Sequence, residues 1–198
     1  MSEILEKLFR SKAEVKIIRL FLNNTEDKYL MSDIADKTKT SLPAIRKEMA
    51  PLEKAGFVST SKKNQKTYYN LNASFLYLDD LRKLFFKAAP SSSDWIRDRV
   101  ARVGQIRLVL ISGSLINSDK GRVDILIVGE HINKSKLTGF LSELEAEVGK
   151  GIRYVYMGND EFKYRKNMFD KFVIDILEGP QKILIENMRF DGNVDNEK

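Results

Sequence analysis

Apolar positions in the first quarter of the chain recur with the period of an α-helix. Between residues 12 and 23, Val15, Ile17 or Ile18, and Leu20 to Leu22 form a wide apolar face, which predicts a packing helix. Farther along, Ile45, Met49 and Leu52 are spaced i, i+4 and i+7 and predict one buried stripe. The other faces of this second helix carry Arg46, Lys47 and Lys54, so its exposed side is expected to be cationic.

Two serines stand where helix N-caps are expected. Ser32 precedes a short helix over 33–37, and Ser41 precedes the helix that begins at Leu42. Only residues 38–40 separate the two, which predicts two helices joined by a tight turn. Gly56 follows the second helix at a position that favours a left-handed cap.

Strand patterns follow that glycine. Residues 57–60 and 67–71 are rich in β-branched and aromatic side chains and predict a hairpin. The predicted tip between them is polar and basic, and consists of Lys62, Lys63, Asn64, Gln65 and Lys66. A hairpin with three lysines after two helices predicts a winged helix-turn-helix.

The remainder of the chain alternates between strand and helix patterns. A third amphipathic helix is expected over 75–86, and the Pro/Ser-rich segment 88–93 predicts a boundary. Beyond it, strands are expected at 106–111, 125–128, 152–157 and 182–185, and helices at 94–103, 136–148, 160–166 and 170–177. This alternation predicts a small α/β unit with a mixed sheet.

We therefore expect an α+β, two-domain protein. The predicted divisions are a winged helix-turn-helix at 1–72, a connector helix and linker at 73–90, the α/β unit at 91–190 and a disordered tail at 191–198. Charge supports the division, because residues 1–87 hold 17 Lys/Arg against 11 Asp/Glu, whereas residues 88–198 hold 17 of each. The whole formal excess of +6 lies in the first part, which favours a polyanionic partner.

Composition excludes several classes of site. The chain has no cysteine, which rules out disulfides and thiolate zinc sites. No signal-peptide pattern and no apolar run of about 20 residues is present, so we expect a cytoplasmic protein with no membrane contact.

The basic face has a specific chemical use. A helix fits the major groove of B-DNA and a wing can follow the adjacent backbone. Arg46 is expected to reach a base edge, because its planar group can bind guanine through two hydrogen bonds, and Lys47 is expected to contact phosphate. The predicted DNA contacts also include Ser41, Leu42, Pro43 and the five residues of the hairpin tip. The alternative is that this face packs against another protein.

The pattern of residues 10–71 resembles the winged helix-turn-helix regulators of bacteria and archaea. The matching positions are Ser41, Ile45, Met49, Leu52 and the segment Ala55-Gly56-Phe57-Val58. The resemblance implies binding to double-stranded DNA. Because one small winged unit reads few bases, we also expect a homodimer on a two-fold symmetric site.

Residues 94–160 resemble, more weakly, nucleotidyltransferases of the polymerase-beta type. Ile111-Ser112-Gly113-Ser114 is similar to the glycine-serine turn of that family, and Val123-Asp124-Ile125 begins a segment similar to its acidic strand. The resemblance implies a turn that holds nucleotide phosphates and two carboxylates, one residue apart, that bind two magnesium ions.

This chain departs from that pattern at the metal ligands. Asp124 matches the second carboxylate, but Arg122 stands where the first should be, and residues 152–157 offer no later acid. We expect Arg122 and Asp124 to form ion pairs, with each other or with neighbouring residues. The predicted site, Gly113, Ser114, Arg122 and Asp124, is vestigial, with no catalytic residue, metal or cofactor.

Two functions follow. The favoured one is a transcriptional regulator whose inactive nucleotidyltransferase-like unit serves dimerisation or the sensing of a small ligand. The alternative is an active nucleotidyltransferase that modifies a protein or a small molecule and uses Ser114 and Asp124 with a further acid, Asp119 or Asp160. A protein-binding adaptor without a nucleic-acid partner is disfavoured by the uneven charge.

Overall fold

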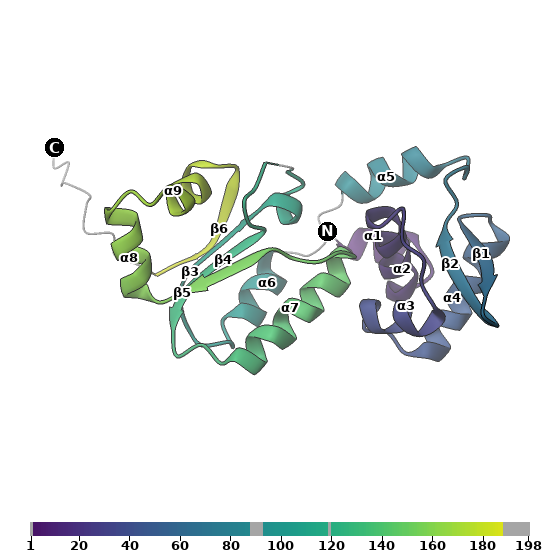
Figure 1. Ribbon diagram of the computed structural model, residues 1–198, viewed down its shortest axis with the longest axis horizontal. Helices are drawn as coiled ribbons and strands as arrows, with labels where there is room; N and C mark the ends of the chain where they lie inside the picture. Colours follow the sequence, from purple (N-terminus) through teal and green to yellow (C-terminus); the bar gives the residue numbers. More distant parts are fainter. Residues whose placement is uncertain (1, 88–92, 119, 188–198) are drawn as a thin grey trace.

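A computed structural model describes residues 2–87, 93–118 and 120–187 (Figure 1). The first part contains four helices, a hairpin and a fifth helix: α1 (Ser2–Leu8), α2 (Lys12–Asn23), α3 (Met31–Thr38), α4 (Leu42–Lys54), β1 (Val58–Lys63), β2 (Lys66–Leu71) and α5 (Leu78–Lys87). The predicted packing helix and the basic helix are confirmed as α2 and α4, whereas α1 was not predicted. The predicted tail at 191–198, and the predicted boundary except Ser93, lie outside the described residues.

The caps of α3 and α4 differ from the prediction. Ser32 does not cap α3, because the helix begins two residues earlier than predicted, with Leu30 as N-cap. The carboxylate of Asp33 accepts a hydrogen bond from the Leu30 backbone N–H at 2.9 Å instead. Ser41 is the N-cap residue of α4 as predicted, but its side chain makes no capping hydrogen bond. Lys39, with φ 51°, reverses the chain between the two helices.

The wing is a longer and tighter hairpin than predicted. Its strands pair antiparallel from Val58↔Leu71 to Lys63↔Lys66, so only Asn64 and Gln65 form the turn. Both residues have positive φ, 49° and 60°, the conformation of a type I′ hairpin turn. The predicted five-residue tip is therefore wrong, since its lysines belong to the strands. Gly56, at φ +79°, confirms the left-handed cap.

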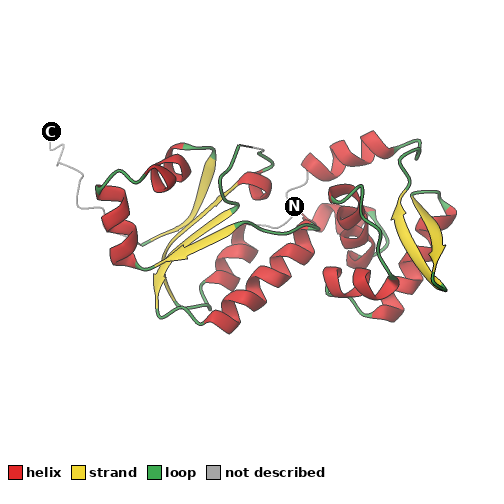
Figure 2. Cartoon of the chain, viewed as in Figure 1, coloured by secondary structure: helices red, strands yellow, loops and turns green. Residues whose placement is uncertain are grey.

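The second part is built on a four-stranded mixed sheet (Figure 2). Its elements are α6 (Ser93–Val100), β3 (Gln105–Ser112), the 3-10 turn η1 (Gly113–Ile116), β4 (Ile125–Glu130), α7 (Lys134–Val148), β5 (Tyr154–Met157), α8 (Asn159–Asn167), α9 (Lys171–Glu178) and β6 (Gln181–Glu186). The strand order is β5-β4-β3-β6, with β4 and β5 parallel and the other pairs antiparallel. The predicted α+β class and mixed sheet are confirmed, with shifts of one to three residues at most element ends.

Helices cover both faces of this sheet (Figure 1). On one face, Ile96 of α6 and Leu144 of α7 pack against Val109 of β3. On the other, Phe162 of α8 and Val173 of α9 are fully buried in a second cluster with Leu108, Leu110, Leu126 and Val128. Because β3 and β4 are buried on both faces, each strand has a run of successive apolar side chains.

The core of the first part is a separate cluster. Its buried residues run from Leu5 to Phe85, whereas the two clusters around the mixed sheet start at Ile96. Leu78 and Phe85 of α5 belong to the first cluster, and the Phe85 ring meets that of Phe9 edge to face, with centroids 5.3 Å apart. The predicted connector helix therefore packs on the hydrophobic core of the first part.

The carboxyl end of α7 is capped by side chains of α2 and of Asn24, the residue that follows α2. The last carbonyl groups of a helix have no partner inside the helix. Here the carbonyls of Glu147, Val148 and Gly149 accept hydrogen bonds from Arg19 (2.9 Å), Asn23 (2.8 Å) and Asn24 (2.6 Å). The first and second parts thus meet through directional contacts.

Charge reinforces this contact. The carboxylate of Glu147, almost fully buried, lies 3.1 Å from the ammonium groups of Lys12 and Lys16. Gly149 allows the close approach, because a Cβ there would lie 2.7 Å from the backbone carbon of Arg19.

Candidate functional site

The α4 helix presents Arg46, Lys47 and Lys54 outward and buries one of its two acids, whereas the other, Glu53, is exposed. Ile45 and Met49 are 0% and 1% exposed, so the predicted stripe faces the core. Glu48 lies beside them, also buried, and accepts a hydrogen bond from the Ser11 hydroxyl at 2.9 Å. Arg46 and Lys47 point the other way and are exposed. The helix that follows the tight turn therefore has an outer surface that is net positive, with three exposed cations and one exposed acid.

The amino-terminal turn of α4 adds little hydrogen-bonding capacity to this surface. Ser41 and Pro43 are exposed, whereas Leu42 is half-buried. Because the Ser41 hydroxyl makes no capping bond, it is the one side-chain hydrogen-bonding group that this first turn offers to a partner. Pro43 can offer only an apolar contact.

The wing extends the positive surface. All five residues predicted at its tip, Lys62, Lys63, Asn64, Gln65 and Lys66, are exposed. Within the described residues, no carboxylate forms an ion pair with these lysines, with Arg46 or with Lys47. We refer to Ser41–Lys47 and Lys62–Lys66 together as the basic face.

The carboxylate predicted in the second part is fully occupied by protein donors. Asp124 immediately precedes β4 and is 2% exposed. Its Oδ1 accepts from the Ser114 backbone N–H at 2.7 Å, from the Ser114 hydroxyl at 2.9 Å and from Arg153 Nη2 at 3.2 Å. Its Oδ2 accepts from the Arg153 backbone N–H at 2.9 Å and from Arg153 Nε at 3.1 Å. Five donors leave this carboxylate little capacity for a metal ion.

These contacts favour the ionised carboxylate. Burial alone would raise the pKa of Asp124, but the hydrogen bonds from Arg153 and Ser114 more than offset it and lower the pKa below its ordinary value. Gly113 makes the arrangement possible, since its φ is +52° and a Cβ there would lie 2.2 Å from Asp124 Oδ1. The predicted glycine-serine turn thus wraps around the carboxylate.

The partner of Asp124 is a residue that the sequence analysis missed. Of the two predicted alternatives, pairing with neighbours is observed: Arg122 reaches Asp175 of α9 at 2.5 Å, and Arg153 pairs with Asp124. The signal for Arg153 was its place near the start of the third predicted strand, because the observed strand β5 begins at Tyr154 and lies parallel to β4 with Tyr154 beside Ile125. That register sets the residues before each strand, Asp124 and Arg153, side by side.

No alternative metal site is evident in the described ranges. No group of three or more His, Asp and Glu side chains there could hold a metal ion. Asp160 is exposed in the first turn of α8, and Asp119 falls outside the described residues. None of the described helices is long and apolar enough to cross a membrane.

Comparisons with known proteins give little further guidance. No protein-family model matches the chain, and no curated protein sequence matches it. Among solved structures, the chain is similar to reduced HlyU from Vibrio cholerae, with 19% identity, a TM-score of 0.33, and coverage of 43% of this chain and 85% of that one. A similarity of this size is too low to assign a fold or a function.

Proposed function

We propose that the chain is a DNA-binding transcriptional regulator. The observation that supports this most is the basic face, in which an exposed arginine-lysine pair on a helix after a tight turn is continued by a hairpin with three exposed lysines. A helix of this kind fits the major groove, and a wing can follow the phosphates beside it. The side chains of the basic face offer few polar contacts to bases, so phosphate contacts supply most of the affinity for DNA.

The proposal includes a homodimer on a two-fold symmetric site. One basic face holds a single arginine suited to bidentate base recognition, and two copies would double the site length and the number of base contacts. Light scattering at tens of micromolar, with and without DNA, measures the mass directly. A monomer under both conditions would remove this part of the proposal and leave DNA binding intact.

We further propose that the second part is not an active nucleotidyltransferase. Two-metal catalysis needs clustered carboxylates, whereas Asp124 is surrounded by donors and its nearest charged neighbour is Arg153. Incubation of the purified protein with labelled nucleoside triphosphates, Mg²⁺ or Mn²⁺ and cell lysate should label no protein. Labelling that disappears in Asp124→Asn would show that the chain is an enzyme.

DNA binding is best tested by footprinting fragments from upstream of the protein's own gene. Salt concentration must be fixed, because affinity for DNA falls steeply with salt. We expect protection of a defined segment by the full chain and none by a variant with Arg46→Ala, Lys47→Ala and the three wing lysines replaced by alanine. Equal protection by both proteins would contradict the proposal.

A further inference from the structure

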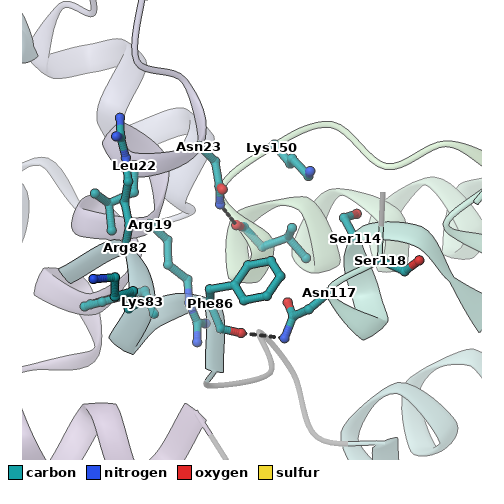
Figure 3. Close-up of a pocket in the computed structure, with 12 residues that line it drawn as sticks. Arg19, Leu22, Asn23, Arg82, Lys83, Phe86, Ser114, Asn117, Ser118 and Lys150 are labelled. Atoms are coloured by element: carbon teal, nitrogen blue, oxygen red, sulfur yellow. Dashed lines mark hydrogen bonds between the residues drawn. The ribbon is translucent and has the colours of Figure 1, made fainter. Parts of the chain in front are cut away.

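A cavity of about 420 Å³ lies between the first and second parts of the chain (Figure 3). One wall comes from α2 and α5, and the other from η1, the loop after it and the end of α7. Its volume is in the range of small-molecule sites. Because both parts contribute walls, a molecule bound here would touch α2 and α5 of the first part and also the mixed-sheet unit.

Among the described residues, the charged groups that line this cavity are all cations. These are Arg19, Arg82, Lys83 and Lys150, and no described lining residue is acidic. Arg82 and Lys83 do have carboxylate neighbours on α5, Asp79 at 3.4 Å and Asp80 at 3.9 Å, but these are exposed pairs within one helix. Exposed pairs of this kind are weak and leave the cations available to a stronger anion.

Arg19 has a different role from the other three. It is 3% exposed and holds the Glu147 carbonyl, and burial lowers its pKa while Glu147 and Glu6 partly offset that effect. Glu147 and Glu6 therefore already balance part of its charge, and Arg19 serves the contact between α2 and α7.

One exposed aromatic ring projects into the same space. Phe86 is 58% exposed, and Figure 3 shows its ring between the cationic wall and the serines of the opposite wall. The carbonyl of Phe86 accepts a hydrogen bond from the Asn117 side chain, which ties the end of α5 to the loop after η1. An exposed phenyl ring held in a cavity offers a stacking surface for a flat ring.

The opposite wall supplies a hydroxyl group. Ser118 Oγ accepts a hydrogen bond from the Lys120 backbone N–H at 3.2 Å, and its own hydrogen has no acceptor among the described residues. Ser114 also lines the cavity, but its N–H and hydroxyl both point to Asp124. The glycine-serine turn is therefore occupied, and the cations of α5 and Lys150 are the groups left to hold an anion.

We propose that this cavity binds a small organic phosphate that carries a flat ring. The ring stacks on Phe86, and the cations of the lining, Arg82, Lys83 and Lys150, attract the phosphate. Such a ligand joins α5 to the end of α7, beside the contacts that α2 makes with that end. An effect of this ligand on DNA affinity rests on the proposed function. Binding of the ligand to the cavity does not depend on that function.

Calorimetry on the full chain tests the binding, with AMP and ATP as ring-bearing phosphates and adenosine and inorganic phosphate as the separate halves. We expect AMP or ATP to bind with a dissociation constant below about 1 mM, and more tightly than either half. If neither binds at that level, or if inorganic phosphate binds as well as both, the proposal is wrong.

Two variants locate the site. The double variant Arg82→Ala, Lys150→Ala should weaken binding about tenfold or more, and Phe86→Ala about threefold to tenfold for AMP and ATP but not for inorganic phosphate. Lys134→Ala, Lys136→Ala is the matched control, because it removes two exposed cations at the opposite end of α7. Equal losses in the control and the cavity variant would place the ligand elsewhere. All the replaced side chains are exposed, and matching circular dichroism melting curves verify that the variants fold.

DNA affinity with and without the bound nucleotide separates the two proposals. A change in affinity that Phe86→Ala abolishes would show coupling between the cavity and the basic face. Nucleotide binding by a chain that binds no DNA would support the cavity and contradict the proposed function. DNA binding with no response to a bound nucleotide would overturn the coupling alone.

Discussion

The basic face and the Asp124 site use charge in opposite ways. The cations of the basic face are exposed and make no ion pair with a carboxylate in the described residues, so they remain available to a partner. Asp124 is buried and accepts five hydrogen bonds from its own chain. Its charge therefore stabilises the contact between β3, η1, β4 and β5. The partners of a charged residue therefore indicate its role. The cations of the basic face, which are unpaired among the described residues, can bind another molecule, whereas the paired Asp124 stabilises the fold.

Asp124→Asn should have the largest effect on stability. All five groups around the carboxylate are donors, so the amide NH₂ of asparagine would face a donor on one side. We expect the free energy of unfolding to fall by about 2 to 3 kcal/mol, at the low end for a broken buried ion pair because the exposed Arg153 can be hydrated. Urea denaturation measures this. DNA affinity measured well below the melting temperature should not change, and a parallel loss of both would mean that the site acts on the basic face.

Arg46→Ala should affect DNA recognition with little effect on stability. Loss of one bidentate base contact costs about 1 to 3 kcal/mol of binding and relaxes the preference at one or two base positions. Arg102→Ala, which removes an exposed arginine after α6, is the matched control. Binding to a library of single-base variants gives the result. If Arg46→Ala weakens binding to all sequences equally, Arg46 contacts phosphate instead.

Replacing Asn23 and Asn24 by alanine should loosen the contact between α2 and α7. The carbonyls of Val148 and Gly149 would lose the side-chain donors that cap them, at a cost of about 1 kcal/mol for each bond. Asn167→Ala at the exposed end of α8 controls for a general effect of asparagine loss. Thermal melting and amide hydrogen exchange of the last turn of α7 check this. Unchanged exchange there would show that the caps contribute little.

A smaller effect is expected from pH. Because the pKa of Asp124 is lower in the folded chain than its ordinary value of 3.8, the ionised group stabilises the fold above that value. This stabilisation should be lost as pH falls below about 4 toward the folded-state pKa. Denaturation between about pH 2.5 and 6 should show a steeper loss of stability for the natural chain than for Asp124→Asn. Equal slopes would contradict the assigned shift.

Most of the secondary structure can be predicted from apolar periodicity, whereas the local hydrogen bonds of caps and turns cannot. Ile45, Met49 and Leu52 identify α4, because a buried stripe depends only on spacing along one helix. Ser32 was wrongly assigned as a cap, since Asp33 competes for the Leu30 amide and extends α3 by two residues. The wing turn was placed too broadly because Asn64 and Gln65 adopt positive φ, which non-glycine residues seldom do.

The sites show the same division between local and long-range information. The exposure of Arg46 follows from its position outside the apolar stripe and could be predicted. The pairing of Asp124 with Arg153 depends on which strands are neighbours, and the cavity depends on how α2 and α5 face η1 and the end of α7. Neither is encoded in the spacing of residues along a single element.

The central claim is that the exposed cations of the basic face bind DNA through its phosphates, and the salt dependence of binding tests it most directly. The slope of log affinity against log salt should become less steep by about 2.7 when Lys62, Lys63 and Lys66 are replaced by alanine, because each lost phosphate contact contributes about 0.9. Replacing Lys134, Lys136 and Lys171, which are exposed in the second part, removes the same charge and should leave the slope unchanged. Equal slopes for the wing variant and the natural chain would contradict the account.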